Sequence, residues 1–94
     1  MNKWRVSAHR EVIKKDMPLL KQANLKDIFD EIVENLKINP YKEYRNFEKL
    51  HPYNRYIYSL RINGQHRVVF TIDKKQRRVK IWSAWSHYES RMPK

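Results

Sequence analysis

The sequence predicts a small α+β domain in which two helices pack on one face of a mainly antiparallel sheet. Three observations support this prediction. The 94 residues suit a single domain. One segment has the apolar spacing of an amphipathic helix, and the last third contains short β-branched and aromatic runs separated by turn residues. We assign residues 1–89 to this domain and residues 90–94 to a flexible C-terminal tail.

The expected order of elements is strand, helix, helix and then three antiparallel strands. The alternating "KWRV" (3–6) predicts the first strand, and Ser7 is placed to cap a helix that runs to about Met17. Pro18 should interrupt or kink that helix, because proline lacks an N–H donor and crowds the preceding turn.

The second helix is marked by apolar residues at every third or fourth position. These residues are Leu25, Ile28, Phe29, Ile32, Val33 and Leu36. Asn24 is the expected N-cap, and Asp27 lies in the first turn, where a carboxylate is favoured. Pro40 should end the helix, and residues 39–55 are expected to form a loop.

Three strands are expected after this loop, at about 56–62, 66–73 and 79–87. The basic turn "DKKQRR" joins the last two. The helices should cover one face of the sheet and leave the other face open.

The register of the first hairpin decides which side chains share the open face. A two-residue turn at Asn63-Gly64 would pair Leu60 with Arg67, whereas a three-residue loop pairs Arg61 with Arg67. We favour the second register, because it keeps one face apolar. The side chains then facing the helices are Tyr58, Leu60, Ile62, His66, Val68, Phe70 and Ile72. Those facing the other way are Ser59, Arg61, Arg67, Val69 and Thr71.

The charge of the chain indicates a polyanionic partner. The net charge is +11, and residues 48–94 contain 11 basic and 3 acidic side chains, against 10 and 7 in residues 1–47. Such a basic excess is typical of nucleic-acid binding, because neutralised phosphates release counterions. A solubilising surface, or a basic face covered by an acidic partner, is the alternative.

Several classes of site are excluded by composition. Without cysteine there are no disulfides, thiolate metal sites or thiol nucleophiles, and a single glycine argues against a phosphate-cradling loop. The four histidines are dispersed, so we expect neither metal nor cofactor. No apolar run approaches the roughly 18 residues of a membrane span and no secretory signal is recognisable, so a cytoplasmic location without membrane contact is expected.

Two arginines at a directly opposed cross-strand position repel each other. A protein that places Arg61 opposite Arg67 is expected to present both to an anion, and the guanidinium fork suits phosphate. The alternative is a solvated pair flanked by carboxylates, for which residues 48–94 offer only Glu48, Asp73 and Glu89.

Taken singly, Glu48 and His87 have ordinary explanations, as an ion-paired loop carboxylate and an exposed strand end. Together with Arg61 and Arg67 they fit the cleavage of RNA without metal. Such cleavage needs a base for the ribose 2′-OH, cations at the phosphate and an acid for the leaving 5′-oxygen. The expected products are a 2′,3′-cyclic phosphate and a 5′-hydroxyl.

Three motifs, "FEKL" (47–50), "YSLRINGQHRVVF" (58–70) and "WSHYE" (85–89), resemble the Txe/YoeB branch of the RelE-like toxins of bacterial toxin-antitoxin modules. The resemblance covers nearly the whole chain in element order and about half of it in motifs. It implies the RelE-like fold and a ribosome-dependent mRNA endonuclease that cuts in the A site. It also implies silencing by an acidic antitoxin of the YefM/Phd type, with a homodimer as a further state.

The resemblance also implies roles for individual residues. Glu48 matches the general base, Arg67 the phosphate-stabilising arginine and His87 the general acid. The positions that it implies for substrate binding are Arg61, Tyr88 and Lys49.

The sequence departs from the pattern of this branch in three places. Leu60 stands where another arginine is usual, which could weaken catalysis or change the cleavage preference. Residues 51–57 differ from the usual glycine-containing loop, and residues 90–94 extend beyond the usual end.

Two other functions stay open at this point. One is a binder without enzymatic activity that has the same fold, such as a toxin resembling the ParE group of gyrase inhibitors. The other is a degenerate module that binds only an antitoxin or RNA. The set of Glu48, Arg67 and His87 favours the enzyme, because a pure binder needs basic residues but no such carboxylate.

Overall fold

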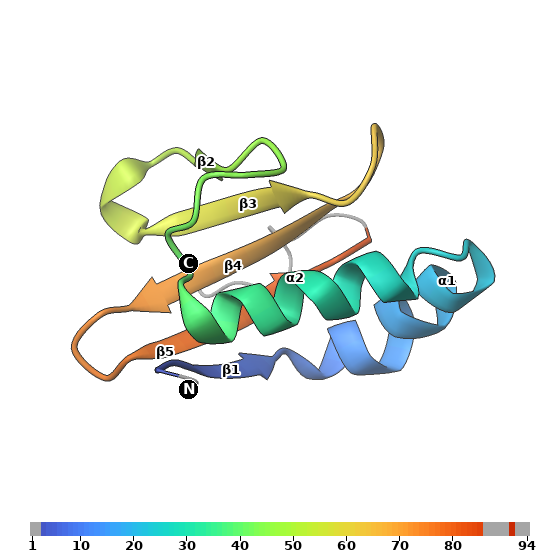
Figure 1. The fold of residues 1–94 in the computed structure, drawn as a ribbon, viewed down its shortest axis with the longest axis horizontal. Helices are drawn as coiled ribbons and strands as arrows, with labels where there is room; N and C mark the ends of the chain where they lie inside the picture. Colours follow the sequence, from blue (N-terminus) through green and yellow to red (C-terminus); the bar gives the residue numbers. More distant parts are fainter. Residues whose placement is uncertain (1–2, 86–90, 92–94) are drawn as a thin grey trace.

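The computed structural model describes residues 3–85 and 91. Its five-stranded sheet has the order β1-β5-β4-β3-β2, with β1 parallel to β5 and the other pairs antiparallel. The strands are β1 Arg5–Ala8, β2 Glu48–Lys49, β3 Ile57–Arg61, β4 Arg67–Asp73 and β5 Arg78–Ser83. Both helices lie on one face of this sheet (Figure 1), so the predicted α+β fold is confirmed, with one additional strand.

The first helical segment does not end at Pro18, contrary to the prediction. A π-helical stretch, Val12–Asp16, continues into α1, Met17–Gln22. The N–H of Met17 donates to the Val12 carbonyl five residues back, and Pro18 occupies the first turn of α1, where its missing donor is tolerated.

The start of this segment also differs from the prediction. Ser7 lies within β1, so it caps no helix. His9 replaces it, because its Nδ1 accepts the backbone N–H of Glu11 at 3.1 Å. The histidine satisfies one of the unpaired donors of the first turn.

Asn24 terminates α1 and does not cap the next helix. Its φ of 59° is left-handed, a conformation that asparagine tolerates better than most residues. The N–H groups of Asn24 and Leu25 donate to the carbonyls of Lys21 and Leu20 at 3.2 and 2.8 Å, which is a Schellman ending. The second helix, α2, then runs over Lys26–Ile38 and ends two residues before Pro40, as expected from the proline.

The hairpin register is the predicted one. Arg61 lies opposite Arg67, Leu60 opposite Val68, and the N–H of Ile62 donates to the His66 carbonyl at 2.9 Å. The core lies between the sheet and the helices. Its buried members include Leu20, Phe29, Ile32, Leu36, Tyr58, Leu60, Ile62, Val68, Phe70, Ile72, Val79 and Ile81.

Residues 39–55 are not entirely a loop. They contain the edge strand β2, where Glu48 pairs with Ser59 and Lys49 with Tyr58, and a 3-10 turn at Tyr53–Arg55. Two residues of strand carry no detectable alternation, so the pattern could not reveal them.

The face away from the helices is less open than expected. Ser59 and Val69 point to this face but are only 2% and 1% exposed. The arginines at its end, Arg61 and Arg67, are exposed. Of the predicted last strand, residues 86 and 87 lie outside the described part of the chain.

Candidate functional site

A hollow of about 420 Å³ opens on the face away from the helices, between β2, β3 and β4. Its lining residues are Asn46, Phe47, Glu48, Ser59, Arg61 and Arg67. The sheet register accounts for this set, because Glu48 lies beside Ser59 across one strand pair and Arg61 beside Arg67 across the next. Three predicted site residues, Glu48, Arg61 and Arg67, therefore meet at one place.

The carboxylate of Glu48 lies 3.8 Å from the guanidinium of Arg67. Both side chains are well exposed, at 62% and 47%, so water screens the pair and it adds little to stability. This contact agrees with part of the alternative interpretation, in which carboxylates flank and neutralise the two arginines. Arg61 has no carboxylate partner among the described residues, however, so the hollow keeps an excess of positive charge.

A tight turn before β2 delivers Asn46 and Glu48 to the hollow. Arg45 and Asn46 both have left-handed φ values, 48° and 55°. The guanidinium of Arg45 donates to the carbonyls of Arg61 and Ile62, each at 3.3 Å, and the Arg61 N–H donates to the Arg45 carbonyl at 2.7 Å. These bonds fasten the turn to β3.

Asn46 and Ser59 were not identified as site residues from the sequence. The one signal for Asn46 is that asparagine is among the few residues that adopt a left-handed conformation readily. Ser59 was placed on this face by the register, but nothing in the sequence marked it as part of a hollow.

Lys49 does not join this group. Successive side chains of a strand alternate, so Lys49 points to the face opposite that of Glu48. Its ammonium lies over the ring of Tyr56, 4.7 Å from the centroid, and 5.9 Å from that of Tyr58. Burial raises the pKa of the Tyr58 hydroxyl above its usual value.

His87 and Tyr88 lie outside the described residues, so their predicted positions stay predictions. The chain is described up to Trp85, whose carbonyl is 2.8 Å from His66 Nδ1. The rings of His66 and Trp85 stack at 3.9 Å. His66 therefore borders the core and fixes Trp85, in agreement with its expected place at the core edge.

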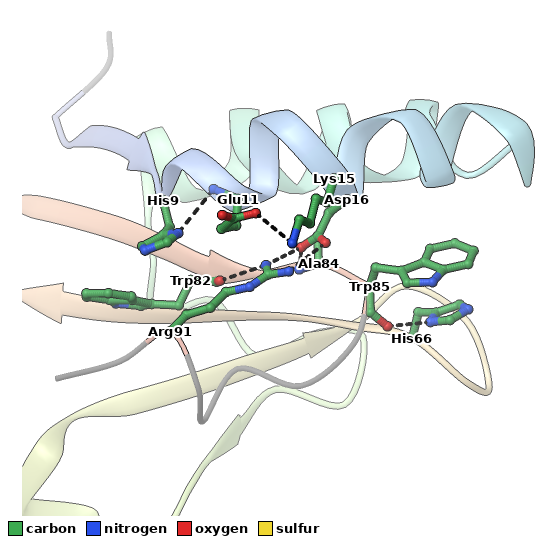
Figure 2. A network of polar contacts seen from close by, with 9 residues as sticks. All are labelled: His9, Glu11, Lys15, Asp16, His66, Trp82, Ala84, Trp85 and Arg91. Carbon is green, nitrogen blue, oxygen red and sulfur yellow. Dashed lines mark hydrogen bonds and ion pairs between the residues drawn. The ribbon is translucent and has the colours of Figure 1, made fainter. Parts of the chain in front are cut away.

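The segment that contains His87 is also flanked by a buried ion pair (Figure 2). Arg91 donates to both carboxylate oxygens of Asp16, at 2.6 and 3.0 Å, and to the Trp82 carbonyl at 3.2 Å. Asp16 also accepts the backbone N–H of Ala84 at 2.9 Å. Hydrogen bonding to Asp16 raises the pKa of Arg91. At Arg91, the predicted flexible tail is held in place, while residues 90 and 92–94 lie outside the described part.

Neither a metal site nor a membrane-spanning helix is found among the described residues. No group of three or more histidine or acidic side chains there could hold a metal ion. No helix in the same part of the chain is both long and apolar enough to cross a membrane.

The chain is similar to several solved toxin structures. No protein-family model and no curated protein matches its sequence. The YoeB-YefM complex from Staphylococcus aureus is 26% identical, with a TM-score of 0.71 over 92% of this chain and 99% of that one. A YoeB dimer from the same organism is 25% identical, with a TM-score of 0.73 over the same shares.

An archaeal RelE-RelB complex from Pyrococcus horikoshii is 26% identical, with a TM-score of 0.72 over 87% of this chain and 92% of that one. The matches cover nearly the full length of each neighbour, and they include toxins bound to their antitoxins. The similarity that the three sequence motifs predicted is thus confirmed by the fold, and these neighbours support a likeness of the chain to the YoeB/RelE-like toxins.

Proposed function

We propose that this chain is a toxin that acts as a ribosome-dependent mRNA endoribonuclease and so inhibits translation. The observation that supports this proposal is the meeting of Glu48, Arg61 and Arg67 around one open hollow. A carboxylate beside two arginines suits proton abstraction next to a phosphate. The similarity to YoeB and RelE toxins makes RNA the expected substrate.

In the proposed reaction, the Glu48 carboxylate takes the proton of a ribose 2′-OH. The oxygen then attacks the adjacent phosphorus, while Arg67 and Arg61 donate hydrogen bonds to the non-bridging oxygens. The bond to the 5′-oxygen breaks, and His87 gives that oxygen a proton. The products are a 2′,3′-cyclic phosphate and a 5′-hydroxyl. Tyr88 and Lys49 remain proposed substrate contacts, Lys49 from the other side of β2.

Cleavage is expected to require the ribosome. Glu48 and Arg67 are both exposed on an open surface, so the protein alone provides little to orient a flexible RNA. Purified protein should leave free mRNA largely intact and cut the same mRNA on programmed ribosomes, as read by primer extension. Rapid site-selective cutting of naked RNA at stoichiometric protein would contradict this expectation. Inhibition of DNA gyrase with no cleavage would support the ParE-like alternative.

The antitoxin is expected to be an acidic protein that covers the hollow. A chain of net charge +11 is neutralised most simply by an acidic segment that becomes ordered on binding. Hydrogen exchange on the complex should show protection at β2, β3 or the segment after Trp85, compared with the toxin alone. If these regions exchange equally fast in both states while cleavage is blocked, inhibition does not occur by masking. Sedimentation of the toxin alone would test the proposed homodimer.

A further inference from the structure

The sheet contains a second pair of directly opposed arginines. Arg5 in β1 lies beside Arg78 in β5, at the edge of the sheet far from β2. Arg78 also pairs with Asp73 on β4, six residues after Arg67, so the second pair points to the same face as Arg67. Six residues of strand separate the two pairs by about 20 Å. No local pattern predicts this pair, because it depends on the parallel contact of β1 with β5.

The cations around the second arginine pair differ in their ion pairing from those on the helices. On the helical side, lysines pair with carboxylates one turn away, for example Lys15 with Glu11 and Lys26 with Asp30. Arg5, Arg78 and Lys80, in contrast, are exposed and have no carboxylate within ion-pair distance among the described residues.

The carboxylate nearest to the second pair in the register belongs to Asp73. It accepts the backbone N–H of Gln76 at 3.2 Å and so serves the turn between β4 and β5. That turn adds further exposed cations, which are Lys74, Lys75 and Arg77. This end of the sheet therefore carries a large excess of positive charge, with Asp73 as the one carboxylate that the register places beside it among the described residues.

An aromatic side chain lies next to these cations. The ammonium of Lys80 is 4.2 Å from the centroid of the Trp82 ring, and the ring of His9 lies 5.6 Å from it. The Trp82 indole N–H donates to the Thr71 hydroxyl at 2.9 Å, which fixes the orientation of the ring. A half-buried indole held in one orientation beside a lysine, on the strand that also carries Arg78, suits single-stranded nucleic acid, through stacking on bases and contacts to phosphates.

We propose that Arg5, Arg78, Lys80 and Trp82 form a second RNA-binding surface, separate from the hollow at Glu48. The arginines and Lys80 hold backbone phosphates, and Trp82 stacks on a base. An acidic peptide would use the cations equally well but would gain little from the half-buried indole, so RNA is the favoured partner. The inference rests on the proposed function, because it takes RNA as the partner of this chain. The surface binds RNA and takes no part in its cleavage.

The test uses the double variant Arg5→Gln/Arg78→Gln and a charge-matched control, Lys15→Gln/Lys26→Gln, on the helices. Binding of a fluorescent single-stranded RNA oligonucleotide is titrated at several salt concentrations. Each lost phosphate contact should lower the magnitude of the slope of log affinity against log salt by about 0.7. The slope for Arg5→Gln/Arg78→Gln should therefore fall in magnitude by about 1.4, and this variant should bind RNA about 10-fold more weakly at low salt. The control should keep nearly the wild-type slope. Unchanged unfolding midpoints would show that both variants are folded.

Equal slopes for the two double variants would overturn the proposal, because net charge alone would then explain binding. Polyglutamate serves as a second probe with the variant Trp82→Leu, which should weaken RNA binding but leave polyglutamate binding nearly unchanged. A loss of affinity for polyglutamate as large as that for RNA in this variant would also count against an RNA surface. Ribosome binding identifies the source of the RNA. If Arg5→Gln/Arg78→Gln loses affinity for ribosomes as well as for the oligonucleotide, the RNA that this surface binds is ribosomal. If wild-type protein does not cut mRNA on ribosomes, the proposed function fails, but the oligonucleotide slopes still decide this inference.

Discussion

Replacing Arg67 by alanine is expected to lower the single-turnover rate of mRNA cleavage on saturated ribosomes by about 100-fold or more. If the guanidinium stabilises charge that develops on the phosphate, its loss removes an interaction made mainly in the transition state. Ribosome binding should change far less, because many other cations remain on the chain. Rapid quenching followed by primer extension measures the rate, and a binding assay run in parallel measures affinity.

The matched control for Arg67→Ala is Arg10→Ala, which removes an exposed arginine from the first helical segment and should leave the rate unchanged. His87→Gln should behave like Arg67→Ala, because glutamine keeps a polar group of similar size but cannot protonate the leaving oxygen. Wild-type rates for both Arg67→Ala and His87→Gln at saturation would refute the catalytic roles. The binding-module interpretation would then be preferred.

Replacing Arg91 by alanine is expected to destabilise the fold by about 3 kcal/mol. Asp16 is 1% exposed and Arg91 11%, so the loss of the guanidinium leaves a buried carboxylate without its main partner. The two hydrogen bonds at 2.6 and 3.0 Å are lost together, and among the described residues only the bond from Ala84 then remains at this carboxylate. Urea unfolding followed by circular dichroism measures the change.

Lys15→Ala provides the comparison for this stability prediction. Lys15 pairs with Glu11 at 3.4 Å, but its side chain is 68% exposed, so the loss should cost less than about 1 kcal/mol. Arg91→Lys should recover part of the lost stability, because an ammonium restores the charge but not the two-pronged geometry. Equal costs for Arg91→Ala and Lys15→Ala would show that the buried pair contributes no more than a surface pair.

The parts of the fold that repeat over several residues were predictable from the sequence. The spacing from Leu25 to Leu36 located α2, and the alternation around Asn63-Gly64 fixed the register that places Arg61 opposite Arg67. Short elements and departures from regular helix geometry were not predictable. A two-residue edge strand is too short to show a hydrophobic period. The π-helical stretch before Pro18 depends on backbone hydrogen bonds, which the side-chain pattern does not predict.

The candidate site was predictable to a similar extent. Glu48, Arg61 and Arg67 follow from motif and register, and the structure brings them together. The resemblance groups Lys49 with them, but Lys49 follows Glu48 directly in the strand, so the two side chains point to opposite faces. The partnership of Asp16 with Arg91 joins residues 75 positions apart. A contact between single residues at that separation leaves no trace in local patterns.

The parallel contact of β1 with β5 also has a consequence for biosynthesis. The first strand to be made pairs with the last, so the sheet cannot close until the chain has been translated through Ser83 and has left the exit tunnel. Contacts between such distant segments raise the contact order and slow folding relative to helical proteins of similar length. Helix α2 and the hairpin of β3 and β4 contain only contacts between nearby residues, so they can form before the sheet closes on β1.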